Sequence, residues 1–166
     1  MKEKFEDVIA KNKDSIFRIC KVYASEPYEP MDLFQEVTFQ AWKSYEKFRG
    51  DSNVSTWIYR VALNVCMQMK NKYEKVNQLT TKLDAVQVIM NDDHDPVQVE
   101  RFIMLKQCID QLNESDRSII VLFLEDLAYR EIGEITGLSE NHVAVKMKRI
   151  KAKLTECMTS KMHTNA

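Results

Sequence analysis

Residues 127–154 constrain the fold of this chain more than any other segment, because they read as two short helices with a break between them. The break is Thr136-Gly137-Leu138, and Gly137 can adopt the left-handed backbone conformation that reverses a chain within a few residues. Ser139 follows at a position where a helix N-cap is needed. Beyond it, apolar residues recur at the spacing of one helical stripe: Val143, Met147, Ile150 and Leu154. We therefore predict a helix-turn-helix.

The second helix of this unit is strongly basic. Between His142 and Lys153 it has no acidic residue and five cations, which are Lys146, Lys148, Arg149, Lys151 and Lys153. With Val143 facing inward, the outward positions are Asn141, Val145 and Lys148, flanked by His142 and Arg149. Unopposed cations on one helix suit a phosphate backbone, so this face is predicted to bind DNA. The alternative is the solvated basic face of an ordinary helix, which the turn chemistry upstream disfavours.

The rest of the chain also reads as helix. Only three Gly and three Pro occur, and strict apolar alternation is rare, which favours an all-α fold. The stretch 76–95 is polar and weakly periodic, so it is the expected linker between two small helical domains, residues 1–75 and 96–166. Helices are expected near residues 4–25, 30–47, 53–75, 96–112, 114–126, 128–136 and 139–157.

The cysteines are expected to be buried small hydrophobes in a reducing compartment rather than disulfide partners. Each sits among helix-periodic residues, and they are far apart in the sequence: Cys20, Cys66, Cys108 and Cys157. The acidic run Asp92–Asp95, which includes His94, reads as a solvated loop, so we predict neither a metal site nor a cofactor. No run of about 18 apolar residues occurs and the amphipathic N-terminus is unlike a signal peptide, which predicts a cytoplasmic protein.

Charge is unevenly distributed along the chain, although the net charge is only −1. Between Val22 and Trp42 there is no Lys or Arg, and the acids in this stretch are Glu26, Glu29, Asp32 and Glu36. The C-terminal helix, by contrast, is basic. Separate patches of opposite sign predict two macromolecular contacts, an acidic surface for a basic protein and a basic surface for DNA.

The helix expected at 53–75 has apolar residues on two faces, which places it at the centre of a bundle. A narrow polar stripe remains between those faces and holds Arg60, Asn64 and Asn71, with Gln68 beside them. Before this helix, residues 48–51 interrupt the helical pattern. Amides and aromatics beside such a loop could hydrogen-bond to unpaired bases and stack on them, with Trp57 as one platform. Taken alone, Trp57 reads more readily as a core residue.

Three linked motifs resemble a known family. DLFQEVTFQAW at Asp32–Trp42, FRGDSNVSTWIYRVALN at Phe48–Asn64 and the C-terminal LNESDRSIIVLFLEDLAYREIGEITGLSENHVAVKMKRIKAKL look like the conserved blocks of extracytoplasmic-function (ECF) sigma factors of bacterial RNA polymerase. They cover most of the chain in the family's order. The resemblance implies an all-α protein in which residues 1–75 form sigma region 2, a three- to four-helix bundle. Residues 96–166 would form the region 4 helix-turn-helix.

The resemblance also implies a role for each surface, in a subunit that directs promoter recognition and is not an enzyme. Region 2 would dock on the clamp of the largest subunit of core RNA polymerase through Asp32, Leu33, Gln35, Glu36 and Phe39. It would read and melt the −10 promoter element through Trp57, Arg60 and Asn64. Region 4 would contact the flap of the second largest subunit and bind the −35 DNA through Asn141, His142, Val145, Lys146, Lys148 and Arg149. An anti-sigma factor is a further implied partner.

The alternative is a stand-alone transcription regulator in which residues 1–75 dimerise or sense a ligand. The acidic surface and the polar, aromatic stripe of that half disfavour it. An enzyme is disfavoured because no nucleophile, base and orienting group form a recognisable constellation.

Overall fold

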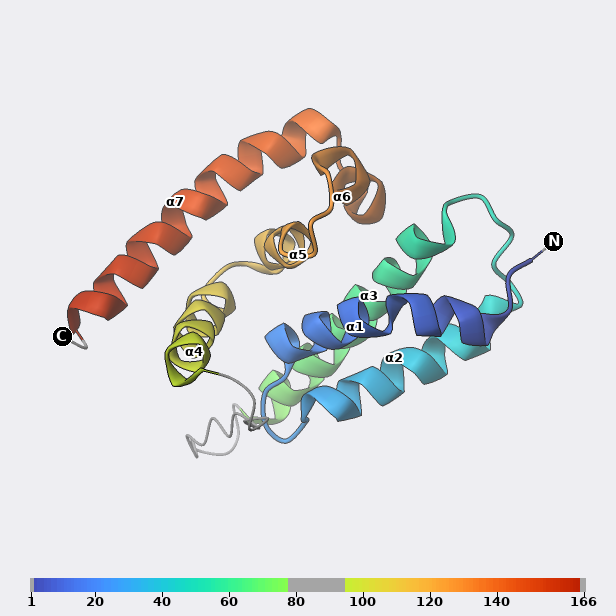
Figure 1. The fold of residues 1–166 in the computed structure, drawn as a ribbon, viewed down its shortest axis with the longest axis horizontal. Coiled ribbons are helices and arrows are strands. Elements are labelled where there is room, and N and C mark those ends of the chain that lie inside the picture. The colour runs from blue at the N-terminus through green and yellow to red at the C-terminus, as the bar shows by residue number, and fades with distance from the viewer. Residues whose placement is uncertain (1, 78–94, 165–166) are drawn as a thin grey trace. The chain divides into compact units, whose positions relative to one another are not determined.

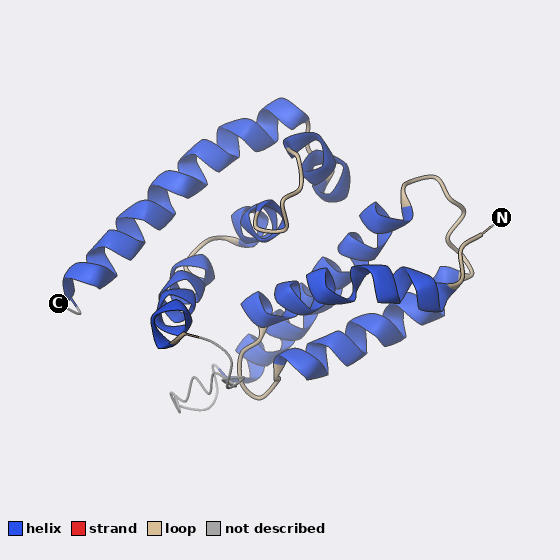
Figure 2. Cartoon of the chain, in the orientation of Figure 1, coloured by secondary structure: helices blue, strands red, loops and turns tan. Residues whose placement is uncertain are grey.

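The computed structural model describes residues 2–77 and 95–164 and is built from helices (Figure 1, Figure 2). In chain order they are α1 (Phe5–Tyr23), α2 (Pro30–Tyr45), α3 (Val54–Asn77), α4 (Pro96–Asp110), α5 (Glu114–Phe123), α6 (Tyr129–Thr136) and α7 (Glu140–Thr164). Neither described range contains a strand, so the prediction of an all-α fold is confirmed. The expected linker at 76–95 lies almost wholly outside the described residues. No described helix is both long and apolar enough to cross a membrane.

The first compact unit is a bundle in which α1, α2 and α3 each contact the other two (Figure 1). The prediction that the third helix has two apolar faces is confirmed, because α3 buries residues on both: Ile58 and Val65 on one, and Tyr59, Leu63 and Cys66 on the other. Since both faces are used for packing, the polar stripe between them is the part of α3 left for solvent.

The second compact unit is built around α7, which both α4 and α5 contact. The corner between α4 and α5 is held by polar groups. The buried Arg117 donates hydrogen bonds to the carbonyl oxygens of Asp110 and Leu112, each at 2.9 Å. At the start of α5 the Asn113 side chain accepts a hydrogen bond from the backbone N–H of Asp116 at 2.8 Å, as an N-cap does. These bonds satisfy carbonyls at the end of one helix and an N–H at the start of the next.

The predicted helix-turn-helix is formed by α6 and α7. Gly137 ends α6 in the left-handed conformation at φ 80°, as its place in the turn requires. The Ser139 hydroxyl accepts a hydrogen bond from the N–H of His142 at 3.1 Å, which confirms its capping role. Gly133 is needed for a separate reason, since a Cβ there would collide with the carbonyl oxygen of Leu138. The turn therefore depends on two glycines for different physical reasons.

Two helix ends differ from the sequence prediction by more than two residues. The fifth helix ends at Phe123 rather than near residue 126, because the chain turns there and Asp126 takes a positive φ of 60°. The last helix runs on to Thr164, beyond the expected end near residue 157.

The prediction for the cysteines is half wrong. Cys20 and Cys66 are free and fully buried, as expected of small hydrophobes. Cys108 on α4 and Cys157 on α7 form a disulfide, with their Cα atoms 5.9 Å apart. Distance along the sequence misled the prediction, because α4 and α7 pack against each other and bring together residues 49 positions apart.

Candidate functional site

The outward surface of the first half of α7 agrees with the sequence prediction. Val143, Met147 and Ile150 are fully buried, so α7 is oriented as the apolar stripe indicates. The residues on the opposite side are exposed; we call them the α7 face, and they are Asn141, His142, Val145, Lys148 and Arg149. Side chains that can reach base edges and side chains that can reach phosphates thus share one helix, directly after a tight turn.

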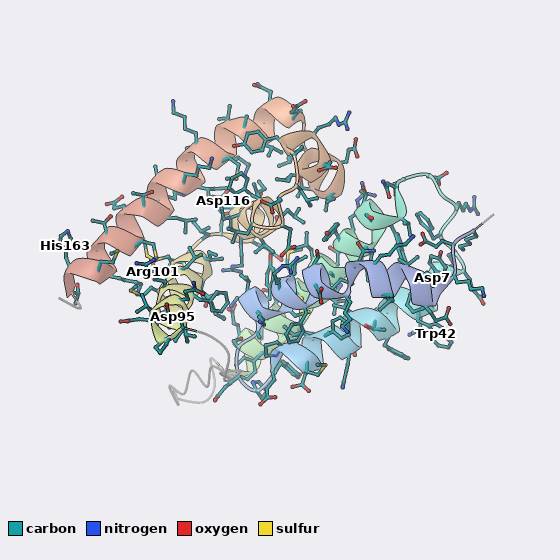
Figure 3. The ribbon with its side chains drawn as sticks, viewed as in Figure 1. Asp7, Trp42, Asp95, Arg101, Asp116 and His163 are labelled. Atoms are coloured by element: carbon teal, nitrogen blue, oxygen red, sulfur yellow. A yellow bond between two sulfur atoms is a disulfide. The ribbon has the colours of Figure 1, made fainter. Side chains whose placement is uncertain are left out.

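Two of the five cations on α7 are opposed by an acid, which corrects the prediction of an unopposed basic helix. Lys146 Nζ lies 3.5 Å from one carboxylate oxygen of Asp116, and Lys153 Nζ lies 3.8 Å from the other. Asp116 is on α5 (Figure 3) and is buried. Lys146 also donates a hydrogen bond to the Ser115 hydroxyl, and only 17% of its side chain is exposed. Lys146, which was expected among the −35 contacts, is therefore held by an ion pair and a hydrogen bond inside its own unit.

The outer side of α2 presents a mixed polar and aromatic surface. Gln35 is exposed, Glu36 is half-buried and accepts a hydrogen bond from Gln40, and Phe39 is 49% exposed. Trp42 stacks on Phe39 with ring centroids 6.5 Å apart, is 62% exposed, and points away from the bundle (Figure 3). The set Gln35, Glu36, Phe39 and Trp42 is called the α2 face below. Apolar rings this exposed on a small monomer are a sign of a binding surface.

Two of the α2 residues that were predicted to bind a partner also have structural roles. Leu33 is only 2% exposed and packs in the bundle, so it offers little surface to a partner and supports the exposed side of α2 from within. The exposed Asp32 accepts a hydrogen bond from the N–H of Glu29 at 2.8 Å in a capping box at the start of α2. Asp32 thus stabilises the first turn of the helix while remaining on the surface.

The polar stripe of α3 lies on the surface as predicted. All its members are exposed, and we keep the name α3 stripe for Arg60, Asn64, Gln68 and Asn71. Trp57, one turn before Arg60, is half-buried in an aromatic cluster, with its ring centroid 5.5 Å from that of Tyr45 and 5.2 Å from that of Phe48. Both interpretations of Trp57 therefore hold in part, because it packs on two rings and keeps some exposed surface.

The loop between α2 and α3 borders an open hollow of about 300 Å³. Its lining combines aromatic rings, two cations, an acid and a glycine in the left-handed region, and consists of Lys2, Glu3, Tyr45, Phe48, Arg49, Gly50 and Val54. Tyr45 and Phe48 stack with centroids 6.2 Å apart. Rings beside a cation are groups on which a base can stack and a phosphate can bind.

Sequence reasoning missed two of the residues that shape these surfaces. Trp42 ended a quoted motif but was not assigned a role, although its position three residues after Phe39 puts both rings on one side of a helix. Asp116 was missed because no local signal links it to lysines 30 or more residues away. Within the described ranges, no group of three or more His, Cys, Asp or Glu side chains could hold a metal ion. Asp95, from the acidic run, caps α4 by accepting a hydrogen bond from the N–H of Val97 at 3.0 Å.

Comparison with known proteins agrees with this arrangement. Residues 8–75 match the family model of Sigma-70 region 2, and residues 102–154 match that of Sigma-70, region 4. The chain is 28% identical over 156 residues to the ECF RNA polymerase sigma factor SigW of Bacillus subtilis (strain 168), covering 87% of this chain and 83% of SigW. It is 25% identical over 142 residues to RNA polymerase sigma factor SigV of the same organism, covering 85% and 82%.

Solved structures share the fold. The sigma factor RpoE, in complex with the anti-sigma factor NepR from Bartonella quintana, aligns with a TM-score of 0.73 at 17% identity, covering 93% of this chain and 96% of that one. CnrH, in complex with the cytosolic domain of CnrY, aligns with a TM-score of 0.70 at 17% identity, covering 94% and 88%.

Together, the paired helical units and their family matches define a sigma-70-type subunit of RNA polymerase. Within that class, the chain belongs to the extracytoplasmic-function group of sigma factors. The sequence prediction of family and function is confirmed, and no observation favours the stand-alone regulator.

Proposed function

We propose that this sigma factor binds core polymerase through the α2 face, the −10 element through the α3 stripe and the −35 duplex through the α7 face. In this proposal it contributes no catalytic group of its own. Polymerase and promoter lie in the cytoplasm, so the protein acts there. The observation that supports this division is that each surface is exposed on a separate helix, while the apolar side of the same helix is used for packing.

The α2 face is the proposed contact with the clamp of the largest polymerase subunit. Phe39 and Trp42 supply exposed aromatic area, the residue type that carries much of the energy of protein interfaces. Gln35 and Glu36 add polar and acidic groups at the side of the rings, which select for a basic partner. Asp32 supports this surface through the cap of α2, and Leu33 supports it from the interior.

The α3 stripe and the aromatic cluster are the proposed site for the −10 element. Arg60 and Asn64 lie one turn apart and can donate hydrogen bonds to base edges and phosphates. Trp57 and Phe48 provide rings for stacking, and the hollow beside the α2–α3 loop offers room next to them. Such groups bind bases that have left the duplex stack more favourably than paired ones, so binding itself drives strand separation.

The α7 face is the proposed reader of the −35 duplex, with its residues entering the major groove from the start of the helix. Lys148 and Arg149 can bind guanine edges or phosphates, while Asn141 can pair with adenine. Region 4 also contacts the polymerase flap in this proposal. An anti-sigma factor is the proposed regulator, since the structural neighbour RpoE was solved with the anti-sigma factor NepR and shares this fold.

Strand opening is the step that tests the proposal. Holoenzyme is rebuilt from core polymerase and the Arg60→Ala/Asn64→Ala variant on a linear promoter fragment, and permanganate reactivity of thymines near −10 is measured. We expect thymine reactivity to fall strongly while core binding and −35 duplex binding are retained, because those contacts lie on other helices. Lys13→Ala, which removes an exposed cation of α1 outside the three surfaces, is the matched control. Normal reactivity in the double variant would assign melting to residues other than the α3 stripe.

A further inference from the structure

All four cysteines of the chain lie in two pairs, one in each unit. In the first unit the thiols of Cys20 on α1 and Cys66 on α3 are within hydrogen-bond reach of each other and remain unbonded. In the second unit Cys108 on α4 is joined to Cys157 on α7. Since the sequence contains no other cysteine, the bonded pair has no competing partner inside its own unit.

The two pairs differ in how an external reagent can reach them. Cys20 and Cys66 are both fully buried. The hydrogen bond between them, together with burial, raises the pKa of the Cys66 thiol well above its ordinary value. Exchange requires an accessible thiolate, so this pair is protected from oxidation. Cys157, by contrast, is half-exposed on the last turns of α7, with Cys108 buried behind it.

We infer that Cys108 and Cys157 form a reversible thiol–disulfide site, at which low-molecular-weight disulfides of the glutathione type oxidise the −35-binding unit. The inference rests on the proposed action of the protein in the cytoplasm, where a disulfide is generally transient and redox-sensing rather than structural. The half-exposed Cys157 is the entry point, and Cys108 is the resolving thiol.

The chemistry balances in two exchanges. The Cys157 thiolate attacks one sulfur of the small disulfide, forming a mixed disulfide and releasing one small thiolate. The Cys108 thiolate then attacks Cys157 Sγ, which forms the protein disulfide and releases the second small thiolate. Two protein thiols are oxidised, one small disulfide is reduced to two thiols, and the reverse sequence restores the dithiol. The side-chain oxygen of Gln111, 3.9 Å from Cys157 Sγ, is placed to accept a hydrogen bond from the Cys157 thiol in the reduced state.

The position of the Cys108–Cys157 disulfide determines how oxidation affects the second unit. It connects α4 with the part of α7 that follows Leu154, the last buried residue of the α7 stripe. In the reduced state α4 is held on α7 by noncovalent contacts alone. Oxidation therefore restricts the separation of α4 from the helix that carries the α7 face, without adding any group to that face.

The test uses the full chain in glutathione buffers that range from reducing to oxidising, followed by acid quenching, alkylation and peptide mass mapping. We expect the Cys108–Cys157 linkage to form in oxidising buffer and to disappear in reducing buffer, with Cys20 and Cys66 still thiols in both. Hydrogen exchange of α4 and α7 peptides should slow on oxidation in the wild type and stay unchanged in Cys157→Ala, which removes the half-exposed thiol. A linkage that never forms, or one that reducing glutathione leaves intact, would overturn the inference. These readouts need neither polymerase nor promoter, so they stand apart from the test of strand opening.

Discussion

Asp116 offers the sharpest test of how the −35-binding unit is held together. Its buried carboxylate faces Lys146 and Lys153, and Asp116→Asn keeps the side-chain shape while removing the charge. Lys153 is 59% exposed, so its share is that of a surface pair, about 0.5 kcal/mol. Lys146 is mostly buried, and removing one partner of a buried pair costs up to about 3–5 kcal/mol. Because Lys146 keeps some contact with water, we expect the total loss of unfolding free energy to be about 2–3 kcal/mol.

Hydrogen exchange measures this loss within one unit. A loss of about 2–3 kcal/mol corresponds to a fall of roughly 30- to 150-fold in the protection of α5 and α7 amides that exchange by unfolding, at 1.4 kcal/mol for each factor of ten. Peptides from α1–α3 serve as an internal control and should not change. Both proteins are kept reduced, so that the Cys108–Cys157 bond does not mask the effect.

A double-mutant cycle separates pairing from other effects of the change. Lys146→Met removes the cation and keeps an apolar stem, and the double variant Asp116→Asn/Lys146→Met leaves no unpaired charge between them. We expect the double variant to be more stable than the sum of the single losses predicts, with a coupling free energy of about 1–2 kcal/mol. Strict additivity, or a loss in Asp116→Asn no larger than that in Lys153→Ala, would refute the assignment of Asp116 as the counter-charge of Lys146.

Two further predictions concern the proposed contacts. Glu36→Lys should lower the affinity for core polymerase by roughly tenfold or more at low salt, through charge reversal in the α2 face, with an unchanged circular dichroism spectrum; unaltered affinity would remove Glu36 from the interface. Lys148→Ala should flatten the dependence of log K for −35 DNA on log salt by about 0.9 if Lys148 binds a phosphate, or weaken one base preference by roughly 1–3 kcal/mol if it binds a base edge. Lys146→Ala should do neither and should instead destabilise the unit. Two variants with the same salt slope and the same base preference would therefore contradict their separate roles.

The sequence predicted helices and their faces well, because a helix repeats every 3.6 residues and its buried side is visible in the spacing of apolar residues. The orientation of α7 followed from Val143, Met147 and Ile150 alone. The burial of Leu33 can be seen in the same way, since Leu33, Val37 and Ala41 form an apolar i, i+4, i+8 row that marks the buried side of α2.

Contacts between helices could not be predicted from the periodicity of apolar residues. The pairing of Asp116 with Lys146 and the bond between Cys108 and Cys157 both depend on which faces of α4, α5 and α7 meet. Periodicity shows that a helix has a buried side but does not name its neighbour. For this reason periodicity identified the exposed sides of α3 and α7, whereas the side chains that neutralise Lys146 or bond to Cys157 became known only from the fold.

The positions of the two tryptophans have a spectroscopic consequence. Trp42 is largely exposed on α2, whereas Trp57 is half-buried against Tyr45 and Phe48, and the chain contains no other tryptophan. Water around one indole and aromatic packing around the other give the two side chains different emission. The protein thus carries a natural fluorophore at its proposed polymerase contact and another beside its proposed site for unpaired bases. Trp42→Phe and Trp57→Phe variants would separate the two signals, so that assembly with polymerase and promoter opening can be followed in real time without an attached dye.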